Sequence, residues 1–267
     1  MPRPQPEQTQ LPVVQRLRVR YAKRGPLRFT SHRDFARAFE RAVRRAGLPI
    51  AYSQGFSPHP KISYASAAPT GAASEAEYLE IGLHTAVDPQ WAHSALDAAL
   101  SKGLDILEVR VASAGAGLAE RINASRWQVE LAGVPPVRLA QAVEVFLAAD
   151  EVFVERLTKQ GRRRFDARGA VTGIRPGAVP DTAGGEPYAM MELVVRQVAP
   201  AVRPDDVLAA LRVLADLEPP VPPRVTRLAQ GALTPSGEIV DPLEDGETTS
   251  GESLVGAMPA TGHEPSE

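Results

Sequence analysis

The first clear hydrophobic pattern in the chain is a two-residue alternation from Arg16 to Tyr21. Leu17, Val19 and Tyr21 occupy every second position, and arginines fill the positions between them. Successive side chains of a strand point to opposite faces of the sheet. The pattern therefore predicts a half-buried strand with a basic outer face.

A helical pattern follows this strand. Thr30 or Ser31 is the expected N-cap, the helix runs to Ala46, and Gly47 and Pro49 end it. The apolar and basic residues of the segment fall on opposite sides of a helix. The apolar side holds Phe35, Phe39 and Val43, and the basic side holds Arg33, Arg37, Arg41 and Arg44. The helix is therefore predicted to pack through its phenylalanines and to expose a row of arginines.

The patterns that come next complete a recurring order of elements. Arms of strands are expected at residues 50–52 and 61–66, strands at 77–83 and 104–111, and a helix at 89–100. Together with the first strand and helix, this gives the order βαββαβ over residues 15–111. That order is typical of a ferredoxin-like domain.

The same order is expected a second time, over residues 123–233. Strands are predicted at 127–131, 152–158, 165–174, 190–197 and 225–229, and helices at 136–148 and 203–214. The basic segment Lys159–Arg164 is expected to be a turn, and Trp91 and Trp127 are expected in the core. The predicted fold class is therefore α+β, with two tandem ferredoxin-like domains joined by a linker at 112–122. This duplication rests on element order alone.

The two ends of the sequence lack periodicity. Residues 1–14 and 234–267 are rich in Pro, Gln, Gly, Ser, Thr and Glu, so disordered termini are expected. The chain contains no apolar run long enough for a membrane helix, and its start has no apolar stretch typical of a signal peptide. With no cysteine, disulfides and thiolate metal sites are excluded. These features favour a cytoplasmic protein without a membrane partner.

Charge is distributed unevenly along the chain. Residues 1–64 hold 13 Lys and Arg against 3 Asp and Glu, whereas residues 237–267 hold 8 Asp and Glu and no Lys or Arg. A basic block of this density attracts polyanions. It therefore points to a nucleic acid as a candidate partner, and the C-terminal segment is expected to be an acidic tail.

Two ungapped motifs carry a resemblance to a known family. They are Arg-Phe-Thr-Ser-His-Arg-Asp at 28–34 and Tyr-Ser-Gln-Gly-Phe-Ser-Pro-His-Pro-Lys-Ile-Ser at 52–63. Through them the chain resembles the bacterial radical-SAM-linked protein family, a domain of unknown function found alone or fused C-terminal to radical SAM proteins. The resemblance implies a radical SAM protein as a partner. Radical SAM chemistry needs closely spaced cysteines, which this chain lacks.

The second motif combines aromatic and polar residues in a short loop. Tyr52, Phe56 and Tyr64 offer aromatic faces, although Tyr52 and Tyr64 taken alone are expected in the core. Gly55 permits unusual backbone angles or a close ligand approach, and prolines stiffen the loop. Aromatic faces beside hydrogen-bond donors and cations suit single-stranded nucleic acid, because bases stack and phosphates seek cations.

The first motif places polar residues at the start of the helix. A helix N-terminus has free N–H groups and a dipole that favour an anion, and Arg28 and Arg33 add positive charge. His32 could donate a hydrogen bond to a phosphate or act as a general acid or base. Topology is expected to bring this helix start and the 54–61 loop side by side.

The sequence thus favours an RNA-binding accessory module that works with a separate radical SAM or RNA-processing partner. Two alternatives remain open: a metal-independent endoribonuclease that uses His32, and a protein–protein adaptor for a radical SAM protein. The favoured interpretation involves no intrinsic activity, whereas the endoribonuclease alternative does, and no cofactor or metal site is expected in either case. The candidate RNA-binding residues are Arg28, Ser31, His32, Arg33, Arg37, Gln54, Gly55, Phe56, Ser57, His59 and Lys61.

Overall fold

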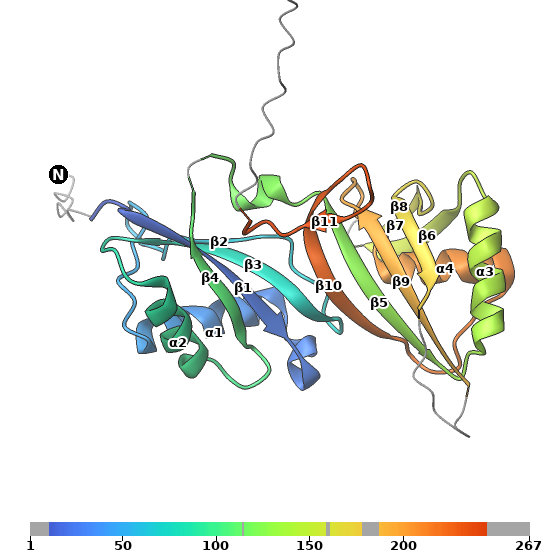
Figure 1. Ribbon diagram of the computed structural model, residues 1–267, viewed down its shortest axis with the longest axis horizontal. Helices are drawn as coiled ribbons and strands as arrows, with labels where there is room; N and C mark the ends of the chain where they lie inside the picture. Colours follow the sequence, from blue (N-terminus) through green and yellow to red (C-terminus); the bar gives the residue numbers. More distant parts are fainter. Residues whose placement is uncertain (1–10, 114, 159–160, 178–186, 245–267) are drawn as a thin grey trace, which may run out of the picture.

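The protein is a mixed α+β molecule built around one large sheet (Figure 1). The computed structural model describes residues 11–113, 115–158, 161–177 and 187–244. Within these residues, four α-helices accompany a nine-stranded sheet and a separate two-stranded hairpin. The strand order along the main path of the sheet is β4-β1-β3-β10-β5-β9-β8.

The first half of the chain supplies one end of the sheet. β1 lies between β4 and β3 and pairs antiparallel with both, and the short β2 pairs antiparallel with β3. Helices α1 and α2 pack their apolar sides into a core with β1 and β3. The elements are β1 (Gln15–Lys23), α1 (His32–Arg45), β2 (Ile62–Tyr64), β3 (Ala73–Leu83), α2 (Pro89–Ala99) and β4 (Ile106–Val111), with the 3₁₀ helix η1 (Gly25–Phe29) after β1.

The second half supplies the other end. β5 lies between β10 and β9, and β8 pairs with the outer edge of β9. Helices α3 and α4 contribute to a second apolar core that includes Trp127. The elements are β5 (Ala124–Ala132), α3 (Pro136–Ala148), β6 (Phe153–Thr158), β7 (Gly161–Asp166), β8 (Val171–Pro176), β9 (Tyr188–Arg196), α4 (Pro204–Ala215) and β10 (Arg224–Leu233).

The two halves are joined by strand pairing and do not form separate sheets. β10 runs parallel to β3, with Thr226 opposite Ala73 and Arg227 opposite Ser74. β2 is only three residues long and pairs with β3 at residues 79–81, so the beginning of β3 offers an unpaired edge. Unpaired edges leave backbone groups without partners. β10 supplies those partners, and the predicted division into two tandem ferredoxin-like domains is not confirmed.

A buried polar cluster lies beneath this junction. Arg227 is 2% exposed and forms an ion pair with Glu77, which is also 2% exposed. The guanidinium also donates to the Ser74 hydroxyl at 3.4 Å and lies over the Trp127 ring at 5.3 Å. Lys23 is 4% exposed, and its ammonium donates to the carbonyl of Ala68 at 3.4 Å. The contact between the halves therefore includes buried, paired charges.

The expected linker and the first part of the expected disordered tail are both packed on the sheet. Within the expected linker, the 3₁₀ helix η2 (Leu118–Arg121) forms, and Leu118 is buried beside Tyr78 and Leu243. Residues 234–244, expected in the acidic tail, include β11 (Ile239–Val240), which pairs with β10. Asp241 accepts hydrogen bonds from the Tyr78 hydroxyl at 2.9 Å and from Arg20 at 3.1 Å. Residues 1–10 and 245–267 lie outside the described residues.

The region around Lys159–Arg164 also differs from its prediction. Arg162, Arg163 and Arg164 belong to β7, which pairs with β6 in its own two-stranded sheet. The expected single strand at 165–174 is divided into the end of β7, a turn and β8. Residues 159–160 lie outside the described residues. Among the described helices, none is both long and apolar enough to cross a membrane.

Candidate functional site

The start of α1 is stabilised by its own side chains. Ser31 is the N-cap, and its hydroxyl oxygen accepts from the Asp34 backbone N–H at 3.2 Å. The same hydroxyl donates to the Asp34 carboxylate at 2.6 Å. The predicted capping is confirmed, and it engages the Ser31 hydroxyl within the helix itself.

The predicted arginine row on α1 is confirmed. Phe35, Phe39 and Val43 are buried on the inner side of the helix. The outer side exposes four residues, here called the arginine face: Arg33, Arg37, Arg41 and Arg44. Arg44 lies 3.9 Å from the Glu40 carboxylate. Within the described residues, Arg33, Arg37 and Arg41 have no acidic partner within 4.0 Å, so their charge is free to meet an anion.

His32 is exposed and contacts an aromatic ring. Its imidazole meets Tyr64 of β2 edge-on, with ring centroids 5.0 Å apart. Burial raises the pKa of the Tyr64 hydroxyl well above its usual range, with a smaller contribution from the charge of Glu40. Within the described residues, no carboxylate lies within ion-pair distance of His32. This contact joins the start of α1 to β2.

The second motif forms a protruding hairpin. Tyr52 pairs with Pro60, and the Ser53 N–H donates to the His59 carbonyl at 2.8 Å. The His59 N–H in turn donates to the Ser53 hydroxyl at 3.0 Å. Phe56 at the tip is 87% exposed. The other candidate residues of the hairpin are also exposed: Gln54, Gly55, Ser57, His59 and Lys61.

The helix start and the hairpin do not adjoin as expected. The prediction assumed that the loop follows a second strand, but β2 begins at Ile62, after the loop. The Gly82 N–H donates to the Lys61 carbonyl, so the hairpin lies near the end of β3. The Arg28 carbonyl accepts from the Gly71 N–H, so η1 lies near the beginning of β3. His32 contacts Tyr64, which pairs with Leu79 near the middle of β3. Within the described residues, the helix start and the hairpin are therefore linked only through this part of the sheet.

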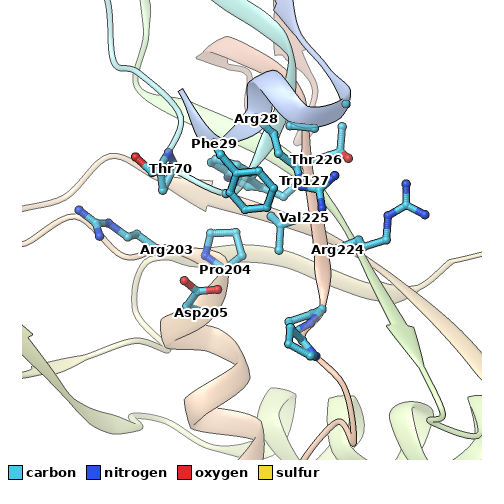
Figure 2. A pocket seen from close by; sticks show the side chains of 17 residues that line it. Arg28, Phe29, Thr70, Trp127, Arg203, Pro204, Asp205, Arg224, Val225 and Thr226 are labelled. Atoms are coloured by element: carbon cyan, nitrogen blue, oxygen red, sulfur yellow. The ribbon is translucent and has the colours of Figure 1, made fainter. Parts of the chain in front are cut away.

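A cavity of about 390 Å³ lies between the two halves (Figure 2). The first half contributes η1 and residues 69–73, and the second half contributes the start of α4, Trp127 of β5 and residues 222–226. Of the predicted site residues, Arg28 lines this cavity. Its guanidinium lies over the Phe29 ring, 4.5 Å from the centroid. The cavity is an inter-half site that sequence patterns did not reveal, since its walls come from five distant segments.

The predicted core positions of the two tryptophans have different outcomes. Trp127 is 5% exposed, as expected. Trp91 is 46% exposed on α2, so its prediction was wrong, because the helix packs through Ala92 and Leu96 instead. Among the described residues, no group of three or more His, Cys, Asp or Glu is placed to hold a metal ion.

Comparisons with known proteins give a family but no activity. A search of curated proteins gives no match. One solved structure, an unknown protein from Galdieria sulphuraria, is 16% identical over 80% of this chain and 98% of its own, with a TM-score of 0.22. A TM-score that low supports no structural argument. Residues 16–204 match the family described as an uncharacterized protein conserved in bacteria (DUF2344). The chain therefore belongs to the DUF2344 family of bacterial proteins.

Proposed function

We propose that this protein is an RNA-binding accessory module whose arginine face contacts the phosphate backbone. The observation that carries the proposal is the exposed row of four arginines on α1, three of them without an acidic partner among the described residues. Arginine forms strong, charge-assisted hydrogen bonds with phosphate. Four of them on one helix face make a local positive potential that steers a polyanion.

The spacing of the arginines suits an extended backbone. Arg33 and Arg44 are eleven residues apart, which spans about 16 Å along a helix axis at roughly 1.5 Å per residue. The backbone of a folded helix already places these arginines along one side. Several of them can therefore bind phosphates without the protein first having to fold. The hairpin tip adds the exposed ring of Phe56, on which a base could stack.

We further propose that the module acts together with a radical SAM or RNA-processing protein, as its resemblance to the radical-SAM-linked family implies. A second candidate function, a protein–protein adaptor, is favoured by one observation. The ring of Phe56 is 87% exposed at the tip of a hairpin braced by Pro58 and Pro60. Exposed aromatic side chains on rigid hairpins are also typical of surfaces that become buried against a protein partner.

We also infer that each half is a ferredoxin-like unit, and that the units are fused edge to edge. The order β4-β1-β3-β2 supports this for the first half, and β10-β5-β9-β8 supports it for the second. The β6–β7 hairpin is then an insertion between α3 and β8. In such a pair of units, the arginine face lies on the first helix of the first unit.

The test is RNA binding at several salt concentrations. A labelled single-stranded RNA of mixed sequence is titrated with the parent chain and with an Arg37→Gln, Arg41→Gln double variant. Removal of each arginine–phosphate interaction should lower the magnitude of the salt slope by about 0.7 to 1. Arg138→Gln, an exposed arginine on α3, is the matched control and should bind like the parent.

Three outcomes separate the candidate functions. If the double variant binds RNA with the same affinity and salt slope as the parent, the proposed role of the arginine face is wrong. Retention of a protein partner after ribonuclease treatment, with loss on Phe56→Ala, would favour the adaptor. Discrete RNA cleavage without added metal, abolished by His32→Ala, would favour an endoribonuclease.

A further inference from the structure

The ring of Phe29 is exposed on the wall of the inter-half cavity. Phe29 is 59% exposed. It is the last residue of η1, and the Thr30 N–H donates to the Leu27 carbonyl at 2.9 Å to close that turn. The Gly71 N–H donates to the Arg28 carbonyl at 2.8 Å, which ties η1 to the segment before β3. These backbone hydrogen bonds hold the turn, and with it the exposed ring of Phe29, at the wall of the cavity.

Apolar side chains of the second half lie opposite this ring, within a cavity whose lining is polar and apolar in similar measure. Figure 2 shows Pro204 and Val225 facing the Phe29 ring from the second half. Trp127 also lines the cavity, and its indole N–H already donates to the Ser125 hydroxyl at 2.8 Å. Trp127 therefore offers the cavity an apolar surface with its polar atom satisfied. A flat, uncharged group is the ligand fragment that such walls accommodate.

The rim of the cavity is cationic. Among the lining residues, Arg28, Arg203 and Arg224 carry positive charge and Asp205 carries the negative charge, a balance of three to one. The Arg224 side chain is 73% exposed, and its guanidinium lies 3.7 Å from the Glu130 carboxylate. At this distance an anionic ligand could compete with Glu130 for the guanidinium. In Figure 2, Arg203 and Arg224 lie on opposite sides of the Phe29 ring, and both side chains extend outward toward the rim. The rim thus favours an anionic group attached to the flat one.

We propose that this cavity binds one nucleotide unit, with the base against Phe29 and the phosphate at the arginine rim. The volume of about 390 Å³ falls within the range for small-ligand pockets, which is about 300–1,000 Å³. The site is distinct from the arginine face and does not depend on it. The unit could be a free mononucleotide or one residue of an RNA chain, since both present the same base and phosphate.

Calorimetric titration of the full chain tests the site. The probes are the four ribonucleoside 5′-monophosphates and a short single-stranded RNA. Phe29→Leu keeps an apolar side chain but removes the stacking face, so it should weaken binding by about 5- to 150-fold, as loss of base stacking does. The Arg203→Ala, Arg224→Ala double variant should also weaken it. Arg175→Ala is the control, because Arg175 is equally exposed and ion-paired but lies on β8.

The outcomes are decisive in each direction. Mononucleotide binding that falls in both cavity variants but not in the control would establish a free-nucleotide site. Binding of the RNA alone, with the same pattern of variants, would establish a site for one residue of an RNA chain. If no probe distinguishes the cavity variants from Arg175→Ala, the proposal is wrong. The Arg37→Gln, Arg41→Gln variant should leave mononucleotide binding unchanged. The experiment can therefore disprove nucleotide binding by the cavity without disproving RNA binding by the arginine face, and the reverse.

Discussion

At the scale of single residues, the most consequential feature is the charge buried where the halves meet. Arg227 and Glu77 are each 2% exposed, and Lys23 lies nearby at 4%. Burying ions is expensive unless they are paired and hydrogen-bonded. Arg227 meets this condition through Glu77 and Ser74, and Glu77 also accepts from the Ala68 N–H at 3.1 Å. These residues therefore link the two halves through a buried ion pair whose polar groups are hydrogen-bonded.

Removing one member of this pair should be costly. Arg227→Met leaves Glu77 buried without its cation, and we expect the free energy of unfolding to fall by about 3–5 kcal/mol. Urea denaturation measures this change. Arg175→Met, which breaks an exposed ion pair with Glu192, should cost less than about 1 kcal/mol. Equal losses in the two variants would show that the buried pair has no special role.

Asp166 should give stability a measurable pH dependence. Burial raises the pKa of this carboxyl, but three backbone N–H donors, from Val152, Gly169 and Arg168, outweigh burial and hold it below its usual value. A depressed pKa in the folded protein means stability that is present above the unfolded pKa of about 3.9 and is lost as the pH falls through the folded one.

Replacement of this carboxylate tests the pH effect. Asp166→Asn cannot accept all three bonds and should lower the free energy of unfolding at neutral pH, whereas at a pH below the folded pKa the two proteins should differ little. Urea midpoints measured across this pH range provide the test. A constant difference between the proteins at all pH values would contradict it.

At the scale of elements, α1 agrees with the sequence prediction in its cap, its buried side and its exposed side. Ser31 caps the helix, Phe35 and Phe39 are buried, and the arginines face outward, all as the periodicity predicts. The same helix packs Phe35 against Tyr21 of β1, with ring centroids 4.3 Å apart. The element was predictable because its cap and its two sides are encoded by residues that are close neighbours in the chain.

The cap itself can be separated from any role in binding. Ser31→Ala removes the acceptor for the Asp34 N–H, and we expect a loss of about 1 kcal/mol in the free energy of unfolding. Ser31→Asn, which retains a capping oxygen, should lose much less. Thermal or urea denaturation provides the measurement. If Ser31→Ala keeps its stability but loses RNA affinity, Ser31 is a ligand contact and its capping role is secondary.

At the scale of the whole molecule, the continuous sheet makes the two halves interdependent. β10 gives β3 its partner at Ala73 and Ser74, and the Arg227–Glu77 pair crosses the same junction. Unfolding either half exposes an unpaired edge and a buried charge of the other. We therefore expect the two halves to unfold together.

Fluorescence can follow one half selectively. Trp91 lies on α2 of the first half and is 46% exposed, so Trp91→Phe should be tolerated and leaves Trp127 of the second half as the reporter. In this variant, the urea transition seen by Trp127 fluorescence should coincide with that seen by far-UV circular dichroism, which reports helices of both halves. Two separated midpoints would show independent domains.

The hairpin and the cavity mark the limit of prediction from sequence. The 52–61 loop was recognisable from its glycine, prolines and aromatics, and its candidate binding residues are exposed, as a binding role requires. Its position was misjudged, because the strand it was expected to follow begins after it. The cavity could not be anticipated, since Phe29, Trp127 and Arg203 are brought together only by the pairing of β3 with β10.

The sequence by itself determined the order of the main elements, the cap and two sides of α1, the exposed hairpin and the concentration of basic charge near one end. Each of these depends on residues close together in the chain, where periodicity and turn chemistry act directly. Only the tertiary structure decided that the halves share one sheet, that residues 234–244 pack against it, and that a cavity forms at the junction. These features depend on which strand edges remain unpaired and on which buried charges must find partners, and both are settled only when distant segments meet.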